Sequence, residues 1–296
     1  MRVVAALLLL SCLAGCQASR SSLPPVPAWQ SPERRDNVQA GAIYDLRAQQ
    51  RLTPEQLVER LAGAPIVLVG EQHDNPDHHA LERWVIQALA TRREQGSVAL
   101  EMLDPSQQQK VAQAQAAPPP KERLAEALGW QAGWDWSLYG PLLGDLVYSP
   151  VPLLAANLER SEVLNIYQVP VALDGKLSTA APVREALLED IRQSHCGLLP
   201  ESQMPAMLAV QQRRDRRMAE RLVQAPRPTL LVAGGFHVRR DLGVPLHLQD
   251  LDAEKGTQVL MLAEAGSVVT VQQADFVWYT PAQLYQDHCA ELRRAR

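Results

Sequence analysis

The sequence predicts an α/β protein, in which a mostly parallel β-sheet is flanked by helices and carries a smaller helical insertion domain. Three observations support this fold class. Short apolar runs rich in β-branched residues alternate with longer segments of helical periodicity. Several of these runs end in polar or glycine-containing turns, which is typical of parallel strands that lead into a ligand crevice. Between residues 161 and 224 the β-branched clusters become sparse and the apolar spacing becomes helical.

Residues 1–15 resemble a lipoprotein signal peptide. A charged start precedes an apolar stretch and a small-residue cleavage site, and Cys16 follows directly. We expect Cys16 to be lipidated and, because Gln17 follows it, we expect the anchor to lie in the outer membrane and to face the periplasm. The alternative is an ordinary signal peptide with an incidental cysteine. Residues 16–40, rich in Ser, Pro, Gln and Arg, are expected to form the lipid anchor and a flexible tether.

Residues 41–160 and 225–290 are predicted to form the sheet domain. Its first helix begins with the capping sequence Thr53-Pro54-Glu55-Gln56 and ends near Gly63. A second helix is expected where apolar residues recur at helical spacing over 80–92, with Asn75-Pro76-Asp77 as its start. The strands are expected, in order, at 66–69, 97–102, 151–157, 229–235, 258–263 and 274–279.

The helical insertion is predicted to span residues 161–224. Its clearest helical pattern runs from Met204 to Ala219. The part of the chain that follows the tether is about 255 residues long, enough for one large domain or for one domain with an insertion. The formal net charge is −4, with acidic and basic residues well mixed, and nothing in this pattern indicates binding to nucleic acid.

Two cysteines, Cys196 and Cys289, remain after Cys12 and Cys16 are assigned to the signal and the anchor. Disulfides persist in the periplasm, so we expect these two to be paired. The bridge would close a loop of ~94 residues, which contributes roughly 4 to 5 kcal/mol in the chain-entropy model. The alternative is two unpaired buried thiols. A zinc site is disfavoured because neither cysteine has a second cysteine at metal-ligand spacing.

Two glycine-histidine turns, Gly70-Glu71-Gln72-His73 and Gly234-Gly235-Phe236-His237, each follow a buried-strand pattern. The carboxyl ends of parallel strands meet at one edge of a sheet, where ligands bind in open α/β folds. We therefore expect Glu71, His73, His78, His79 and His237 to lie in one region. His78 and His79 are adjacent, so on a helix they point in different directions and are not expected to bind the same ion.

Several ordered motifs resemble those of the ChaN-like haem-binding lipoproteins, in a superfamily that includes Tiki-type proteases and erythromycin esterases. The resemblance covers most of residues 40–290. Its motifs are the run Val67 to His79, Trp134 to Tyr139, Leu154 to Asn157, His195-Cys196-Gly197, the helix Gln211 to Ala219, and Gly234 to Arg239.

The resemblance implies an outer-membrane lipoprotein that takes part in haem uptake beside a TonB-dependent haem receptor. It also implies haem as the cofactor, a large parallel sheet with a smaller helical domain, and a homodimer that holds two stacked haems between its subunits. In such proteins a tyrosine of one subunit binds the iron, and a histidine and a lysine of the other subunit bind the propionates.

Carried over to this chain, the resemblance implies Tyr139 as the iron ligand, with Tyr148 and Tyr167 as substitutes. A phenolate suits ferric iron. The alternative is that Tyr139 packs its ring in the core with its hydroxyl bonded to a neighbour. The candidates for the propionates are His195, His237 or the histidines at 73–79, together with Lys176 or an arginine, namely Arg213, Arg214 or Arg239.

Glu71, His73, Glu101 and His237 also supply the residue types of a Glu/His-dependent periplasmic hydrolase, which is the alternative function. The spacing of Glu71 and His73 differs from the i, i+4 spacing of a helical zinc motif, so a metal site there would be assembled from separate loops. A third interpretation is that these side chains brace the sheet edge through hydrogen bonds. We expect haem binding and transfer without an obligatory catalytic step.

Overall fold

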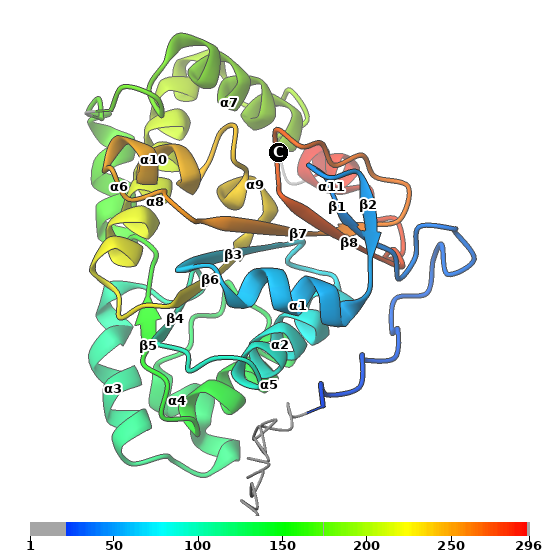
Figure 1. Cartoon of the computed structure of the whole chain (residues 1–296). Coiled ribbons are helices and arrows are strands. Elements are labelled where there is room, and N and C mark those ends of the chain that lie inside the picture. Colours follow the sequence, from blue (N-terminus) through cyan, green and yellow to red (C-terminus); the bar gives the residue numbers. More distant parts are fainter. Residues whose placement is uncertain (1–21, 174, 295–296) are drawn as a thin grey trace, which may run out of the picture.

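The computed structural model describes residues 22–173 and 175–294, so the predicted signal peptide, Cys16 and the start of the tether lie outside the described residues. The predicted α/β fold class is confirmed. Within residues 22–173 and 175–294, eight strands form one mixed sheet in the order β2-β1-β8-β7-β3-β6-β4-β5 (Figure 1). The strands are β1 (Ile43–Asp45), β2 (Gln50–Leu52), β3 (Ile66–Glu71), β4 (Ser97–Leu100), β5 (Leu153–Ala155), β6 (Thr229–Gly234), β7 (Gln258–Glu264) and β8 (Phe276–Thr280).

The six strands from β8 to β5 run parallel, and the β1–β2 hairpin adds an antiparallel edge beside β8. All six parallel strands coincide with predicted strands, although β4 and β5 are shorter than expected. The two hairpin strands were not predicted because each has only three residues, too few to show an alternating pattern.

Helices cover both faces of the sheet (Figure 1). They are α1 (Pro54–Ala62), α2 (Pro76–Ala90), α3 (Gln108–Ala116), α4 (Leu124–Leu128), α5 (Trp136–Val147), α6 (Arg160–Gln168), α7 (Ala181–Ser194), α8 (Met204–Gln224), α9 (Gly235–Val238), α10 (Val244–Asp250) and α11 (His288–Arg294). Short 3-10 turns occur at Pro105–Gln107, Lys121–Arg123 and Glu201–Gln203. Among the described residues, no helix is long and apolar enough to cross a membrane.

The local signals in the sequence explain where the helices begin. Thr53 caps α1 in a complete capping box with Gln56, as predicted. The second helix begins at Pro76, as its start sequence predicted, because the side chain of Asn75 accepts hydrogen bonds from the first turn. As a result His78 and His79 lie inside the first turns of α2.

Two apolar cores lie on opposite faces of the sheet. One core includes Leu57, Trp84 and Tyr139 from α1, α2 and α5, and the other includes Met218 and Leu248 from α8 and α10. A third, smaller cluster joins α7 and the first half of α8 within the segment predicted as the insertion. Helix α8 therefore packs on the sheet with its second half and carries the added helices on its first half.

Residues 22–40, which the composition predicted to be part of a flexible tether, pack against the sheet domain. Trp84 Nε1 donates to the carbonyl of Pro24 (2.9 Å), and Asp77 accepts from the backbone N–H groups of Gln30 (2.6 Å) and Ser31 (3.1 Å). Glu33 also forms a β-bridge with Ala282. A polar composition does not reveal such contacts, because the backbone of the segment supplies them.

The expected disulfide joins Cys196 to Cys289, with the two Cα atoms 5.6 Å apart. It links the end of α7 to α11, two segments separated by 93 positions in the chain. The bridge thus ties the helical insertion to the C-terminal end of the chain.

We predict that Cys289→Ser lowers the free energy of unfolding by up to roughly 4 kcal/mol, because the unfolded chain regains the freedom of a long loop. Urea unfolding of the wild type and the variant measures the loss. The double variant Cys196→Ser/Cys289→Ser is the control and should match the single variant. Equal midpoints for the wild type and both variants would contradict the prediction.

Candidate functional site

The carboxyl ends of three adjacent strands, β4, β6 and β3, bring the candidate residues together. Glu71 ends β3 and is paired in register with Gly234, which ends β6. Glu101 directly follows β4. A Cβ atom on Gly234 would lie 2.8 Å from Nε2 of His73, so glycine here leaves room for the His73 ring.

The first group at this edge is a carboxylate–imidazole–carboxylate chain. Nδ1 of His237 lies 2.5 Å from Oδ1 of Asp215, and its Nε2 lies 3.2 Å from Oε1 of Glu101. The other carboxylate oxygen of Glu101 accepts from the backbone N–H of Gly234 (2.7 Å). Both ring nitrogens of His237 are thus engaged within the protein.

Opposite pKa shifts follow from this arrangement. Burial by itself lowers the pKa of His237, but the charges of Glu101 and Asp215 outweigh it and raise the pKa to about 10. Burial by itself raises the pKa of Glu101, but His237 and the bond from Gly234 lower it to about 2. At neutral pH the group therefore contains an imidazolium beside the ionised carboxylate of Glu101.

The second group centres on Glu71. Its Oε1 accepts from the hydroxyl of Tyr139 (2.7 Å) and lies 2.8 Å from Nδ1 of His73. Burial lowers the pKa of His73, but Glu71 outweighs this effect, and the net pKa is raised. The His73 side chain is 44 % exposed, so it is the part of this group that solvent reaches.

The third group extends from Glu71 into α2. His79 lies between two carboxylates, with Nε2 3.4 Å from Oε2 of Glu71 and Nδ1 3.3 Å from Oε2 of Glu82. Burial lowers the pKa of His79, but Glu82 and Glu71 raise it to about 9 overall. His78 is separate from this group: it accepts from the N–H of Gln72 (2.9 Å) and contacts Thr280, and burial lowers its pKa to about 3.

Two depressions open beside these groups, and we call them together the edge cleft. They share His73, Gly234 and Phe236 and have volumes of about 130 Å³ and about 340 Å³. The smaller one reaches under α7, and the larger one is lined by apolar residues of 261–269 and by Arg239. Phe236 and Val268 are 57 % and 82 % exposed, so the wall of the larger depression is apolar and open.

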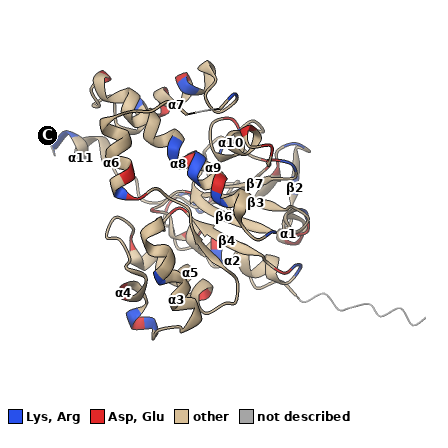
Figure 2. Cartoon of the chain, turned by 90° about the vertical axis from the view of Figure 1, so that its left-hand side faces the viewer, with Lys and Arg blue, Asp and Glu red and all other residues tan. Residues whose placement is uncertain are grey.

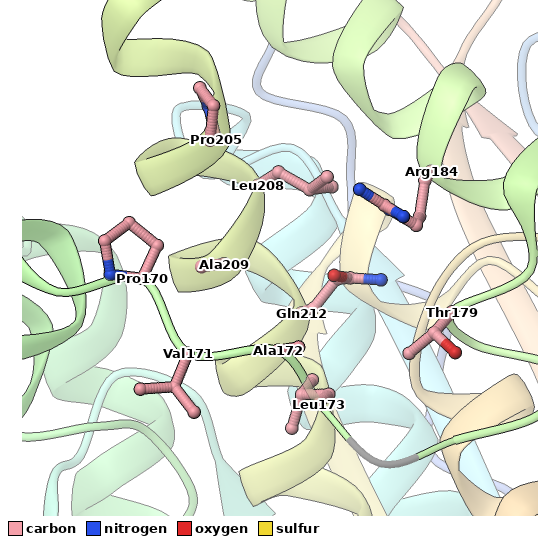
Figure 3. Close-up of a pocket in the computed structure, with 10 residues that line it drawn as sticks. All are labelled: Pro170, Val171, Ala172, Leu173, Thr179, Arg184, Pro205, Leu208, Ala209 and Gln212. Atoms are coloured by element: carbon pink, nitrogen blue, oxygen red, sulfur yellow. The ribbon is translucent and has the colours of Figure 1, made fainter.

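A separate depression of about 240 Å³, the α8 groove, is formed by 170–173 and the α8 residues Leu208, Ala209 and Gln212 (Figure 3). Arg184 lies across it from Pro170 in this view. Val171 also lines a neighbouring depression with the α8 residues Arg213 and Arg216. Figure 2 shows the basic segments that α8 contributes to this part of the molecule.

The tyrosines do not line the edge cleft. Tyr139 is 1 % exposed, and burial together with Glu71 raises the pKa of its phenol. Its ring packs edge-on against Trp134, with the ring centres 5.7 Å apart. Tyr148 is exposed at the end of α5, donates to the carbonyl of Pro119 and lines a separate depression of about 810 Å³. Tyr167 lies on α6, whose Asn165 and Ile166 line the depression next to the α8 groove.

The candidates for the propionates are spread over the molecule. Arg239 lines the edge cleft and pairs with Asp241 (2.8 Å) and Asp190 (3.1 Å). His195 ends α7, where its Nδ1 contacts the carbonyl of Ile191 (2.8 Å). Lys176 lies apart, in a loop whose backbone is held by Asp250.

The sequence predicted that Glu71, His73, Glu101 and His237 lie together, but it did not reveal Asp215, Glu82 or Gln211. Nε2 of Gln211 lies 3.1 Å from Nδ1 of His237. Asp215 interrupts a run of arginines on α8, which resembled a solvated helix face. Its side chain is fully buried instead and contacts His237. An acidic residue on the buried side of an amphipathic helix was the signal that could have identified it.

The comparisons with known proteins agree with the geometry of the sheet. A family model described as "Haem-binding uptake, Tiki superfamily, ChaN" matches residues 57–248. The chain is similar to ChaN of Campylobacter jejuni, a structure described as showing cofacial haem binding, with 31 % identity, a TM-score of 0.74, and coverage of 80 % of this chain and 95 % of that one. An erythromycin esterase, EreC, in its open conformation is 14 % identical with a TM-score of 0.46 and 86 % coverage of both chains, which is too distant to support an argument. No curated protein matches the chain.

We predict that His237 contributes to the free energy of unfolding and that this contribution is lost at alkaline pH. Its pKa is raised from 6.5 to about 10, so its contribution is fully present below pH 6.5 and is lost as the pH rises through 10. A pKa that is higher by one in the folded state than in the unfolded state corresponds to about 1.4 kcal/mol of stability. Urea unfolding of the wild type and His237→Gln should therefore show a gap in stability that narrows between pH 6.5 and pH 10. A gap that is constant over this range would contradict the predicted protonation of His237.

Proposed function

The chain belongs to the ChaN family of haem-binding uptake proteins in the Tiki superfamily, and on this basis we propose that it binds haem non-covalently and passes it on during iron acquisition. The observation that supports a haem site in this chain is the edge cleft. Haem is flat and mostly apolar and carries two carboxylates, so its site needs an apolar wall and a few cationic donors. Phe236 and Val268 supply such a wall beside His73 and Arg239.

His73 is the histidine that best fits a propionate in this proposal. It lines the cleft, is partly exposed, and its raised pKa favours the cationic form. His237 fits less well, because Asp215 and Glu101 occupy both of its ring nitrogens. Arg239 would bind the second propionate, and it would give up its ion pair with Asp190 to do so.

The iron ligand in the proposal is Tyr139, with Tyr148 and Tyr167 as the substitutes. The hydroxyl of Tyr139 lies 3.0 Å from Nδ1 of His73, directly behind the cleft. Iron ligation by Tyr139 therefore requires the His73 ring to move outward and the phenol to lose both its proton and its contact with Glu71. Tyr148 and Tyr167 lie away from the edge cleft, on α5 and α6.

A second copy of the chain completes the proposed site. The larger depression is open to solvent, so it covers one face of a flat ligand and leaves the other face bare. A second haem-loaded copy would cover that face, in keeping with the cofacial arrangement described for the relative from Campylobacter jejuni. We propose a homodimer that forms on haem binding.

The proposed location is the outer membrane, with the protein anchored through Cys16 and facing the periplasm. The signal-like residues 1–15 and the cysteine that follows them support this location. A TonB-dependent haem receptor in the same membrane is the proposed partner, since an anchored carrier would receive haem where the receptor releases it.

We predict that Val268→Asp weakens ferric-haem binding by the full chain about tenfold, because a carboxylate replaces an apolar contact and repels the propionates. Val171→Asp is the matched control, since Val171 is also exposed but lines the α8 groove. Absorption titration and size-exclusion chromatography measure affinity and dimer formation. A loss of affinity in Val171→Asp alone would move the haem to the α8 groove, and no saturable binding by the wild type would refute haem binding.

The same titration on Tyr139→Phe and Tyr167→Phe assigns the iron ligand. A tyrosinate charge-transfer band that disappears in only one of these variants identifies that tyrosine. Retention of the band in both variants would contradict both assignments.

Hydrolysis is the second candidate function, because Glu71, His73, Glu101 and His237 converge around Gly234 beside the smaller depression. In this function the exposed His73 would transfer protons at the mouth of the cleft, and His237 would be held by its two carboxylates. We predict for this function a measurable turnover of small esters that drops at least about 100-fold in Glu101→Gln. The hydrolase function is contradicted if the wild type shows no turnover, or if the wild type and Glu101→Gln turn over the esters equally fast.

A further inference from the structure

The buried side chains of Glu71, His79 and Glu82 form a cluster behind His73, and of these only Glu71 takes part in the proposed haem binding or hydrolysis. The exposed fractions of the Glu71, His79 and Glu82 side chains are 0 %, 4 % and 0 %. One potential ligand atom from each of the three lies within 4.8 Å of the others. His79 and Glu82 are three residues apart on α2, so they share a helix face, and that face meets the end of β3.

Among the described residues, two carboxylate oxygens in this group have no hydrogen-bond partner. They are Oε2 of Glu71 and Oε1 of Glu82, and both are inaccessible to solvent. Leaving a buried carboxylate oxygen unpaired is costly, because it loses its bonds to water without gaining others. Glu101, at the end of the neighbouring strand, is equally buried, but its two oxygens contact the N–H of Gly234 and the ring of His237.

We propose that Glu71, His79 and Glu82 bind one divalent transition-metal ion between β3 and α2. Carboxylate and imidazole donors suit Zn²⁺ and Mn²⁺. The two unpaired oxygens would bind the ion, and the ion would displace the proton from Nδ1 of His79 and take over the positive charge between the two carboxylates.

The surrounding contacts orient all three ligands. Tyr139 and His73 hold Oε1 of Glu71, which leaves Oε2 directed toward His79. Nε2 of His79 lies 3.0 Å from the carbonyl oxygen of His73, and donation to this carbonyl leaves Nδ1 for the ion. Metal-binding histidines commonly donate their second ring N–H to a backbone carbonyl in this way.

The site is separate from the proposed haem iron, since it lies behind the His73 ring rather than in the edge cleft. Its role would be to join the end of β3 to the first turns of α2, and thereby to fix the position of Glu71 under His73. The proposal therefore stands or falls independently of haem binding.

The test is the metal content of the full chain after incubation with Zn²⁺ or Mn²⁺ and removal of the excess. The wild type should retain about one ion per chain, and Glu82→Gln should retain almost none, because it loses a charged ligand at nearly constant volume. Glu101→Gln is the matched control, because Glu101 is a buried glutamate at the same edge of the sheet and both of its oxygens have partners. This variant should retain the ion.

A thermal-melting series makes the test independent of how well the variants fold. Zn²⁺ or Mn²⁺ should raise the melting temperature of the wild type, EDTA should reverse the rise, and Glu82→Gln should not respond. If Glu82→Gln does not fold, His79→Gln replaces it. The proposal is wrong if the wild type neither retains an ion nor responds to one, and a proton shared between the two carboxylates would then explain the cluster. It is also wrong if Glu82→Gln retains the ion.

Discussion

Neutralising the buried carboxylates at the ends of β3 and β4 is the constraint on which the rest of the site depends. Parallel strands place Glu71 and Glu101 at one edge, below the surface, where an unpaired charge is costly. Two histidines supply the balancing charge, His237 for Glu101 and His73 for Glu71. Each histidine lies within three residues of the end of a β-strand, so the backbone that forms the sheet also positions the compensating groups.

This constraint explains why glycine occupies Gly234. The strand end must let His73 and Glu101 approach from two sides, and any Cβ there would collide with the His73 ring. The same residue donates its N–H to Glu101. The glycine-histidine turn is thus required by packing and by charge, whichever ligand the edge cleft binds.

The two proposed functions use different parts of one edge. Haem binding uses the outer, apolar wall at Phe236 and Val268, whereas hydrolysis uses the inner carboxylate–histidine groups. A metal ion behind Glu71 would support either function, because it would fix the side chain against which His73 rests. His73 lies where the proposed haem site, the hydrolase residues and the proposed metal site meet. Its position therefore determines whether a ligand in the edge cleft can reach the buried side chains behind it.

The sequence by itself determined the α/β class, the six parallel strands and the family, because apolar periodicity, glycine turns and short ordered motifs are local signals. It also predicted the Cys196–Cys289 bridge, because only these two cysteines remain once Cys12 and Cys16 are assigned to the signal and the anchor. It also determined that Glu71, His73, Glu101 and His237 share an edge, since parallel strands end on the same side. Only the tertiary structure decided that Tyr139 is buried against Glu71, that Asp215 and Glu82 belong to the site, and that residues 22–40 pack on the sheet domain. The physical reason is that these outcomes depend on contacts between segments far apart in the chain, which leave no periodic trace in either segment.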